Sequence, residues 1–357
     1  MVGAVTTETS AAPAGSAAGG AAGPARPVPV AARLHIVTGK GGTGKTTVAA
    51  ALAVALAHPR RSVLLAEVEG RQGISQTFDV PPLGIEETRV TRTAGGGQIV
   101  GLSVDAKAAL LEYLQLFYHL GRAGKLLERF GAVDFATTIA PGVRDVLVIG
   151  KIYEASRRRA DGRHKGAGPP AYDAVVLDAP PTGRIGRFLS VNSEVAELAR
   201  VGPIHSQAQS ITELLTSDTT VVHLVTLLEE MPVQETLEAV AELRAKGLPI
   251  GAIVVNMVRE PLLDDAALDS ARGGRLHKPS ITTQLQEAGL PVSAGLVDGL
   301  LDEARDHAWR VDLEREQLAL LEATGLPLVV LGALPDGVDS VSVRELADAL
   351  ADQGMAP

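Results

Sequence analysis

The sequence of 357 residues contains no cysteine, and this absence excludes several kinds of site. Without thiols the chain can form no disulfide, no zinc site with cysteine ligands and no cysteine nucleophile. Aromatic residues make up only 3%, and no apolar run reaches the ~20 residues that cross a bilayer. Basic residues are also in the minority, with 33 Lys and Arg against 42 Asp and Glu and a formal net charge of −9. We therefore expect no nucleic acid as the main partner, because phosphate backbones select basic surfaces.

Residues 1–31 lack the basic start and apolar core of a secretory signal, and they are rich in Ala, Gly and Pro. This composition predicts a disordered tail. Order is expected from residue 32 onwards, and we predict one domain over residues 32–357. A chain without a secretory signal or a membrane-spanning run is expected to be cytoplasmic.

Short apolar runs alternate with helical stretches along most of this domain. The runs predicted as strands lie at residues 34–38, 62–68, 174–178, 221–226, 250–256 and 326–331. Buried strands that alternate with helices indicate an α/β fold with a doubly wound, mostly parallel sheet.

Two regions with helical patterns, at about residues 105–165 and 186–216, interrupt this alternation and predict a helical subdomain. In the first region Leu110, Leu111, Leu114 and Phe117 leave only a narrow polar stripe. Such an apolar helix either packs into the core or lines a groove for an apolar client, and both interpretations stay open here.

A glycine-rich loop directly follows the first predicted strand and precedes a helix over residues 45–57. It consists of Gly39, Lys40, Gly41, Gly42, Thr43, Gly44, Lys45 and Thr46, with Thr47 next. Its glycines let the backbone wrap around phosphates and present N–H donors, and the helix start favours anions. We expect Lys45 to reach the β and γ phosphates and the Thr46 hydroxyl to ligate Mg²⁺. The pattern predicts a site for ATP and Mg²⁺.

Asp178 ends the predicted strand at 174–178, which places its carboxylate at the ligand-binding edge of a parallel sheet. We expect it to hold Mg²⁺ through water.

Two motifs resemble a known family. Lys40, directly after the first glycine, is typical of the deviant Walker A class, which includes the nitrogenase iron protein, MinD and ParA ATPases and ArsA-like ATPases. The segment A-P-P-T-G-R-I-G-R-F-L after Asp178 resembles the switch "D-T-A-P-T-G-H-T-x-R-F-L" of the ArsA-like ATPases. That family includes the arsenite-pump ATPase, the tail-anchored-protein targeting ATPase and bacterial proteins described as anion-transporting ATPases.

The resemblance implies roles for these residues. Lys40 would reach across a dimer interface to the partner's ATP. Asp178, Pro181, Thr182 and Gly183 would sense the γ-phosphate and move the helical subdomain.

The other switch of the family, "D-P-A-H-x-L-S", corresponds here to Glu69, Gly70, Arg71 and Gln72 and the residues that follow. The resemblance places Glu69 at the catalytic aspartate, where its carboxylate reaches one methylene further and would position the attacking water. Glu67 is nearby but lies inside the strand, and Glu69 is preferred. By the same resemblance Asn256 would read adenine, Pro335 would lie in the adenine-side loop, and Glu235-Thr236 belongs to a "V-T-x-P-E…E-T" element.

Taken together, the resemblance implies an Mg-ATP-driven switch that works as a homodimer or as a heterodimer with a paralogous ATPase. The switch would act on a membrane-protein client or drive a membrane transporter for anions or metalloids. It would reach the inner membrane through a partner. Without cysteine the chain cannot clamp zinc or bind metalloid as family members do.

Two alternatives stay open. One is a weakly hydrolysing or non-hydrolysing regulatory subunit of a heterodimer. It is suggested by Glu69, which stands where the family has its catalytic aspartate. The other is a ParA- or MinD-like positioning ATPase. It predicts an amphipathic membrane-targeting C-terminal helix or a basic patch, and the acidic segment 342–357 shows neither.

Overall fold

The computed structural model describes residues 32–68, 70, 72–105, 108–109, 141–161, 168–198, 203–335 and 337–356. The predicted tail at 1–31, the apolar segment from Leu110 to Phe117, and the switch residues Glu69 and Arg71 lie outside these residues. The tail, the client groove and the boundaries of the helical subdomain therefore stay predictions.

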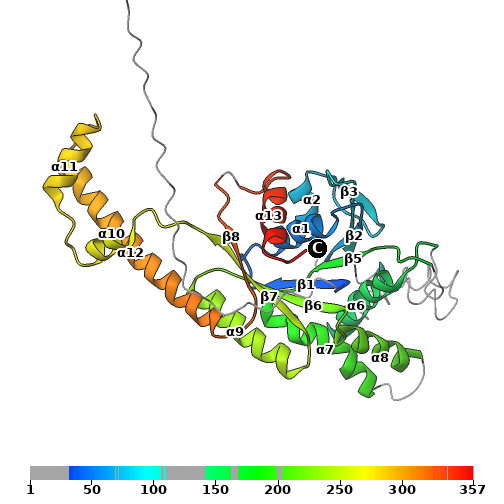
Figure 1. The fold of residues 1–357 in the computed structure, drawn as a ribbon. Coiled ribbons are helices and arrows are strands. Elements are labelled where there is room, and N and C mark those ends of the chain that lie inside the picture. Colours follow the sequence, from blue (N-terminus) through cyan, green and yellow to red (C-terminus); the bar gives the residue numbers. More distant parts are fainter. Residues whose placement is uncertain are drawn as a thin grey trace, which may run out of the picture.

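One eight-stranded sheet organises the described chain (Figure 1), with the strand order β3-β4-β2-β5-β1-β6-β7-β8. Its strands are β1 (Leu34–Gly39), β2 (Ser62–Val68), β3 (Thr88–Arg92), β4 (Gln98–Val104), β5 (Ala174–Asp178), β6 (Thr220–Thr226), β7 (Ile250–Val258) and β8 (Leu328–Gly332). Every neighbouring pair is parallel except β3 and β4. The predicted α/β class and mostly parallel sheet are confirmed.

Helices cover both faces of the sheet (Figure 1). One face carries α1 (Lys45–Leu56), α2 (Gly73–Phe78) and α13 (Ser342–Asp352), and the other carries α6 (Pro141–Arg157), α7 (Thr182–Leu198), α8 (Pro203–Leu215) and α9 (Glu230–Ala245). Alternate side chains of each strand point to opposite faces, so Leu34 and Ile36 enter one hydrophobic core and Val37 enters the other. This double burial explains the continuous apolar runs of the central strands.

Helix α1 is buried on nearly all sides, because it lies between the sheet and α13. Its sequence KTTVAAALAVAL is dominated by alanine and valine, and the residues from Val48 to Ala53 are fully buried. Small side chains let α13 approach closely, and its Val343, Leu346 and Leu350 pack into the same core.

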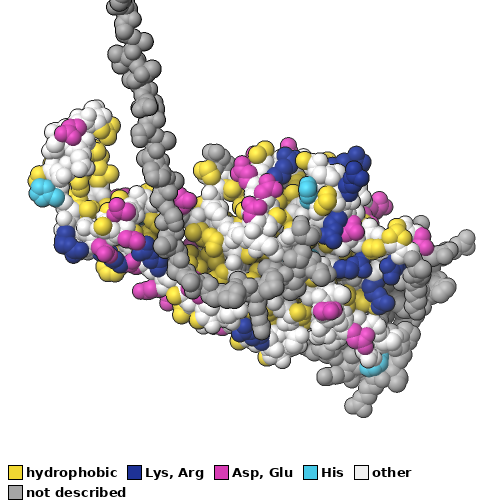
Figure 2. Space-filling view, in the orientation of Figure 1, with side chains coloured by type: hydrophobic (Ala, Val, Ile, Leu, Met, Phe, Trp, Pro, Cys, Tyr) yellow, Lys and Arg dark blue, Asp and Glu magenta, His cyan; other side chains and the backbone are white. Residues whose placement is uncertain are grey.

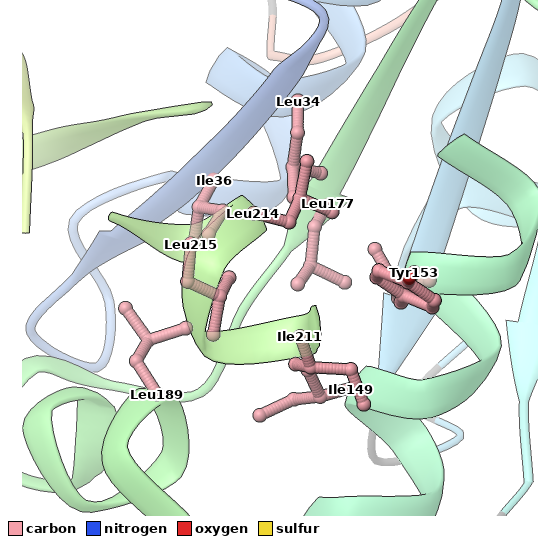
Figure 3. A pocket seen from close by; sticks show the side chains of 10 residues that line it. Leu34, Ile36, Ile149, Tyr153, Leu177, Leu189, Ile211, Leu214 and Leu215 are labelled. Atoms are coloured by element: carbon pink, nitrogen blue, oxygen red, sulfur yellow. The ribbon is translucent and has the colours of Figure 1, made fainter. Parts of the chain in front are cut away.

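The opposite core contains a small apolar cavity between the sheet and helices α6, α7 and α8 (Figure 3). Its volume is about 10 Å³, and its lining includes Ile36, Ile149, Leu177, Leu189 and Ile211. A cavity of this size is at the lower limit for a single water molecule, and an apolar lining gives such a molecule no hydrogen bonds. It is a packing defect and not a ligand site.

An arm of three helices projects from the body between β7 and β8 (Figure 1). It consists of α10 (Asp265–Arg272), α11 (Lys278–Glu287) and the long α12 (Ala294–Glu322). The arm has its own small hydrophobic core of Leu268, Ala271, Ala308 and Val311. Apolar side chains are visible on the surface of the arm (Figure 2). Trp309 and Leu313 of α12 are among the exposed ones. Among the helices that the structure describes, none is long and apolar enough to cross a membrane.

Candidate nucleotide-binding site

The glycine-rich loop connects β1 to α1 and can be built only with glycine at several positions. Gly42 and Gly44 have φ angles of 91° and 83°, a region that favours glycine. A Cβ atom on Gly39 would lie 2.1 Å from the carbonyl oxygen of Val225, and one on Gly44 would lie 2.3 Å from Nδ2 of Asn256. Gly41 and Gly42 instead face open space, so the backbone of the loop is accessible to a ligand from that side.

Hydrogen bonds inside the loop gather at one carbonyl group. The carbonyl oxygen of Lys40 accepts from the Thr43 hydroxyl at 2.9 Å and from Nζ of Lys45 at 3.1 Å. Thr43 and Lys45 are both buried, whereas Thr47 on the first turn of α1 is partly exposed. The Lys45 ammonium therefore lies over the loop that would hold the phosphates.

Two oxygen ligands suited to Mg²⁺ meet beside this loop. The Thr46 hydroxyl donates a hydrogen bond of 2.6 Å to Oδ2 of Asp178, which ends β5 next to β1. Within the described residues no cluster of three His, Asp or Glu side chains could hold a metal. A magnesium ion bound by one or two protein oxygens, phosphate oxygens and water fits this pair of ligands.

The segment after Asp178 is anchored to the end of β1. The Thr38 hydroxyl donates to the carbonyl oxygen of Pro180 at 2.7 Å. The backbone N–H of Ala179 donates to the carbonyl oxygen of Val37 at 2.9 Å. Thr182 then begins α7 with its side chain buried, while Pro181 is partly exposed and Gly183 is exposed. The predicted switch thus begins at the glycine-rich loop and continues into a helix of the opposite face.

The flanks of the other predicted switch are held by Glu67, which the sequence argument set aside as a strand residue. Its buried carboxylate accepts from the backbone N–H groups of Gln72 at 3.1 Å and Ile74 at 3.3 Å. Glu67 is the register partner of Asp178, and both lie on the face of the sheet that α1 covers. The alternation of side chains along β2 indicates this placement in the sequence. Leu64, Ala66 and Val68 face the other core, so Glu67 must face the α1 side of the sheet.

The end of the same switch packs closely against Thr46, one of the two residues predicted to bind Mg²⁺. A Cβ atom on Gly73 would lie 2.8 Å from Cγ2 of Thr46. The side chain of Gln72 holds Leu83 through two hydrogen bonds to its backbone, and Gly70 has a positive φ of 63°. The start of α2 therefore lies next to Thr46.

Lys40 forms an ion pair within its own chain. Its Nζ atom lies 2.9 Å from Oε1 of Glu235 on α9, and Oε2 of the same carboxylate accepts from the Thr182 hydroxyl at 3.1 Å. The hydrogen bond from Lys40 holds the pKa of Glu235 below its ordinary value. Sequence reasoning grouped Glu235 with a family element and gave it no contact in the site.

The two residues proposed for adenine recognition lie in different surroundings. Asn256 is buried near the end of β7, and its side-chain NH₂ group donates to the carbonyl oxygen of Thr43 at 2.9 Å. Pro335 is exposed in the turn after β8. Asn256 therefore supports the phosphate loop, and a contact of either residue with adenine stays a prediction.

Comparison with known proteins identifies the family of the chain. The sequence model of a family described as "Anion-transporting ATPase" matches residues 32–216. The chain is 50% identical to ATPase BagA of Mycobacterium tuberculosis over 323 residues, which cover 90% of this chain and 94% of that protein.

More distant relatives are identical to the chain at about a quarter of the aligned residues. It is 25% identical to a putative arsenical pump-driving ATPase of Chlorobaculum tepidum, over 68% of this chain and 65% of that protein. It is also 26% identical to ATPase GET3 of Kluyveromyces lactis, over 63% of this chain and 72% of that protein. With its nucleotide-binding loop and these relatives, the chain belongs to the anion-transporting ATPase family and is an ATPase of the ArsA and GET3 type.

Proposed function

We propose that the chain binds Mg-ATP at residues 39–47 and hydrolyses it as a nucleotide-switched dimer. The observation that carries this proposal is the 2.6 Å contact between Thr46 and Asp178, directly beside the buried Lys45. It brings together the hydroxyl and the carboxylate that are predicted to bind Mg²⁺, next to the lysine that is predicted to bind phosphate. Bound Mg²⁺ would neutralise charge on the phosphates, which is its usual contribution to phosphoryl transfer.

The residues of the chain divide the remaining work. The backbone N–H groups of the loop and the start of α1 bind phosphate oxygens, and Lys45 exchanges its bond to the Lys40 carbonyl for a phosphate. Glu69 orients the water, and its neighbours are fixed by Glu67 through Gln72 and Ile74. Asp178 and the segment that leads to α7 carry the result to the helices of the opposite face.

Association of two chains is supported by the surface around the site. Lys40 is partly exposed, and so are Met231 (58%) in the first turn of α9, Met257 (47%) near the end of β7 and Val341 (55%) before α13. These residues lie at or after the carboxyl ends of neighbouring parallel strands, the sheet edge at which the glycine-rich loop lies. Removing these apolar side chains from water between two chains would favour association.

The output that we propose is the handling of a membrane protein, or of a transporter for anions or metalloids. A putative arsenical pump-driving ATPase among the relatives supports a coupling to transport. A MinD-like role is less supported, because the apolar residues Val343, Leu346 and Leu350 of α13 are buried against α1 and are not exposed for membrane binding.

The test is phosphate release from Mg-ATP by the purified protein, with Lys45→Ala as the blank. We expect the wild type to turn over above the blank, and Lys45→Ala to lose nucleotide binding because its ammonium is the buried cation of the loop. Normal ATP affinity in Lys45→Ala would refute the assignment of the loop.

A second outcome would favour the alternative function. The wild type could bind ATP and release no phosphate. That result would favour a regulatory subunit that needs a paralogous ATPase for turnover, and it would agree with the glutamate at position 69, where the family has aspartate.

A further inference from the structure

One carboxylate connects the glycine-rich loop to the switch helix. Oε1 of Glu235 pairs with Lys40 at 2.9 Å, and Oε2 accepts from Thr182 at 3.1 Å. The three residues come from three separate segments, which follow β6, β1 and β5. A change at Lys40 therefore alters the electrostatic environment of the first residue of α7.

The packing of α7 on α9 makes this contact sensitive to movement. Gly186, one turn after Thr182, lies so close to α9 that a Cβ atom would be 1.9 Å from Oε1 of Glu242. Glu235 and Glu242 are seven residues apart and share one face of α9. The first two turns of α7 thus lie against this face, and α7 cannot shift along α9 without disturbing the bond between Thr182 and Glu235.

A single ammonium group cannot be paired fully with Glu235 and with a nucleotide phosphate at the same time. The side chains of Lys40 and Glu235 are 29% and 31% exposed, so water screens their attraction in part. Exposed pairs of this kind change an equilibrium constant by at most about fivefold. The contact is therefore strong enough to bias Lys40 and weak enough to be exchanged.

We propose that Glu235 is a positioning residue that holds Lys40 against the start of α7 within its own chain and competes with nucleotide phosphate for it. The inference rests on the proposed nucleotide-driven association, in which Lys40 contacts the partner's ATP. When Lys40 leaves, Glu235 keeps its bond to Thr182 and loses its cation. Release of Lys40 and rearrangement of α7 are then linked through one side chain.

The experiment is a double-mutant cycle on association. Sedimentation velocity with Mg²⁺ and a non-hydrolysable ATP analogue would measure the analogue concentration that gives half-maximal dimer. The chains are the wild type, Glu235→Gln, Lys40→Ala and the double variant. Glutamine keeps the size of the side chain and can still accept from Thr182. The matched control is Glu238→Gln on the next turn of α9, where the carboxylate accepts from Gln234 on its own helix.

We expect Glu235→Gln to lower that concentration by up to about fivefold, Glu238→Gln to leave it unchanged, and the effect of Glu235→Gln to vanish without Lys40. An unchanged value, or the same shift in the Lys40→Ala background, would overturn the proposal. A purely structural role of Glu235 would not depend on Lys40.

The failure of the proposed function has a different signature. If no chain associates, the dimer is wrong, and binding of a fluorescent ATP analogue to the monomer tests instead whether Glu235 competes for Lys40 with the phosphates of a nucleotide bound to the same chain. Tighter binding by Glu235→Gln that requires Lys40 would support the competition, and equal binding would contradict it.

Discussion

His35 on β1 and His223 on β6 stack inside the sheet core, with ring planes 10° apart and a distance of 3.2 Å between Nδ1 of His35 and Nε2 of His223. Both side chains are fully buried. Burial lowers the pKa of His35 to about 4, and it lowers the pKa of His223 well below the ordinary value. Both rings are therefore neutral in the folded protein at neutral pH.

The pair makes stability depend on pH in one direction. An unfolded histidine takes up a proton below about pH 6.5, whereas folded His35 does so only near pH 4. Between these values the unfolded state binds more protons, so the free energy of unfolding falls as the pH falls. Stability is fully present above pH 6.5, and His35 alone is expected to cost about 2 kcal/mol between pH 7 and pH 5.

Urea unfolding at pH 7, 6 and 5 would measure this loss, and the His35→Leu/His223→Leu double variant is the comparison. Its free energy of unfolding should depend less on pH, whatever its absolute value. Identical slopes for the two proteins would contradict the assignment to these rings.

Glu67 gives a second expectation at the level of one side chain. Its two oxygens accept one backbone N–H each, from Gln72 and Ile74. Glu67→Gln leaves one acceptor and turns an NH₂ group toward the other N–H, so we expect a loss of about 1–3 kcal/mol in the free energy of unfolding. Chemical denaturation measures it. The exposed Glu86 is the control, since Glu86→Gln should change stability by less than about 0.5 kcal/mol.

In the candidate site, the positions of residues that are contiguous in sequence could be predicted, and contacts made through the tertiary structure could not. Gly39 to Thr46 lie in one loop, as their local pattern predicts, and Asp178 lies at the end of β5 as its apolar strand predicts. The contact of Glu235 with Lys40 depends on how α9 follows β6, which no local pattern encodes. Glu67 was set aside although strand parity puts it on the face of Asp178.

At the level of elements, burial decides which strands the sequence reveals. The runs at 62–68 and 174–178 match β2 and β5 because central parallel strands are apolar throughout. The edge hairpin of β3 and β4 was not predicted. Most of β3 is exposed, with the sequence TRVTR, and glycine interrupts β4. An edge strand buries too little surface to leave an apolar pattern.

The arm is expected to be the least protected folded part of the described chain. Helix α11 has no buried residue, and only four residues form the core of the arm. Local opening therefore exposes little apolar surface and costs little free energy. In hydrogen exchange followed by mass spectrometry, amides of α11 should exchange faster than those of α1 by at least about two orders of magnitude. Equal protection of the two helices would mean that another surface covers the arm.

For the whole molecule, the strand order explains how distant segments form one site. Strands β2, β5, β1, β6 and β7 are consecutive and parallel, so their carboxyl ends meet at a single edge. Glu67, Asp178, Lys40, Glu235 and Asn256 all lie at or just after these ends. A sequence that specifies the parallel sheet thereby specifies the neighbourhood of the site, while the side-chain contacts depend on helix packing.

The burial of α1 has a mechanical consequence. A helix enclosed by the sheet on one side and by α13 on the other has no space to tilt or slide, because close-packed interiors resist deformation. The start of α1, at the base of the candidate nucleotide site, is therefore expected to stay fixed relative to the sheet. A conformational change driven by nucleotide binding or hydrolysis would then have to occur in the segments next to Asp178 and Glu67. The rigid core thus determines which segments can move.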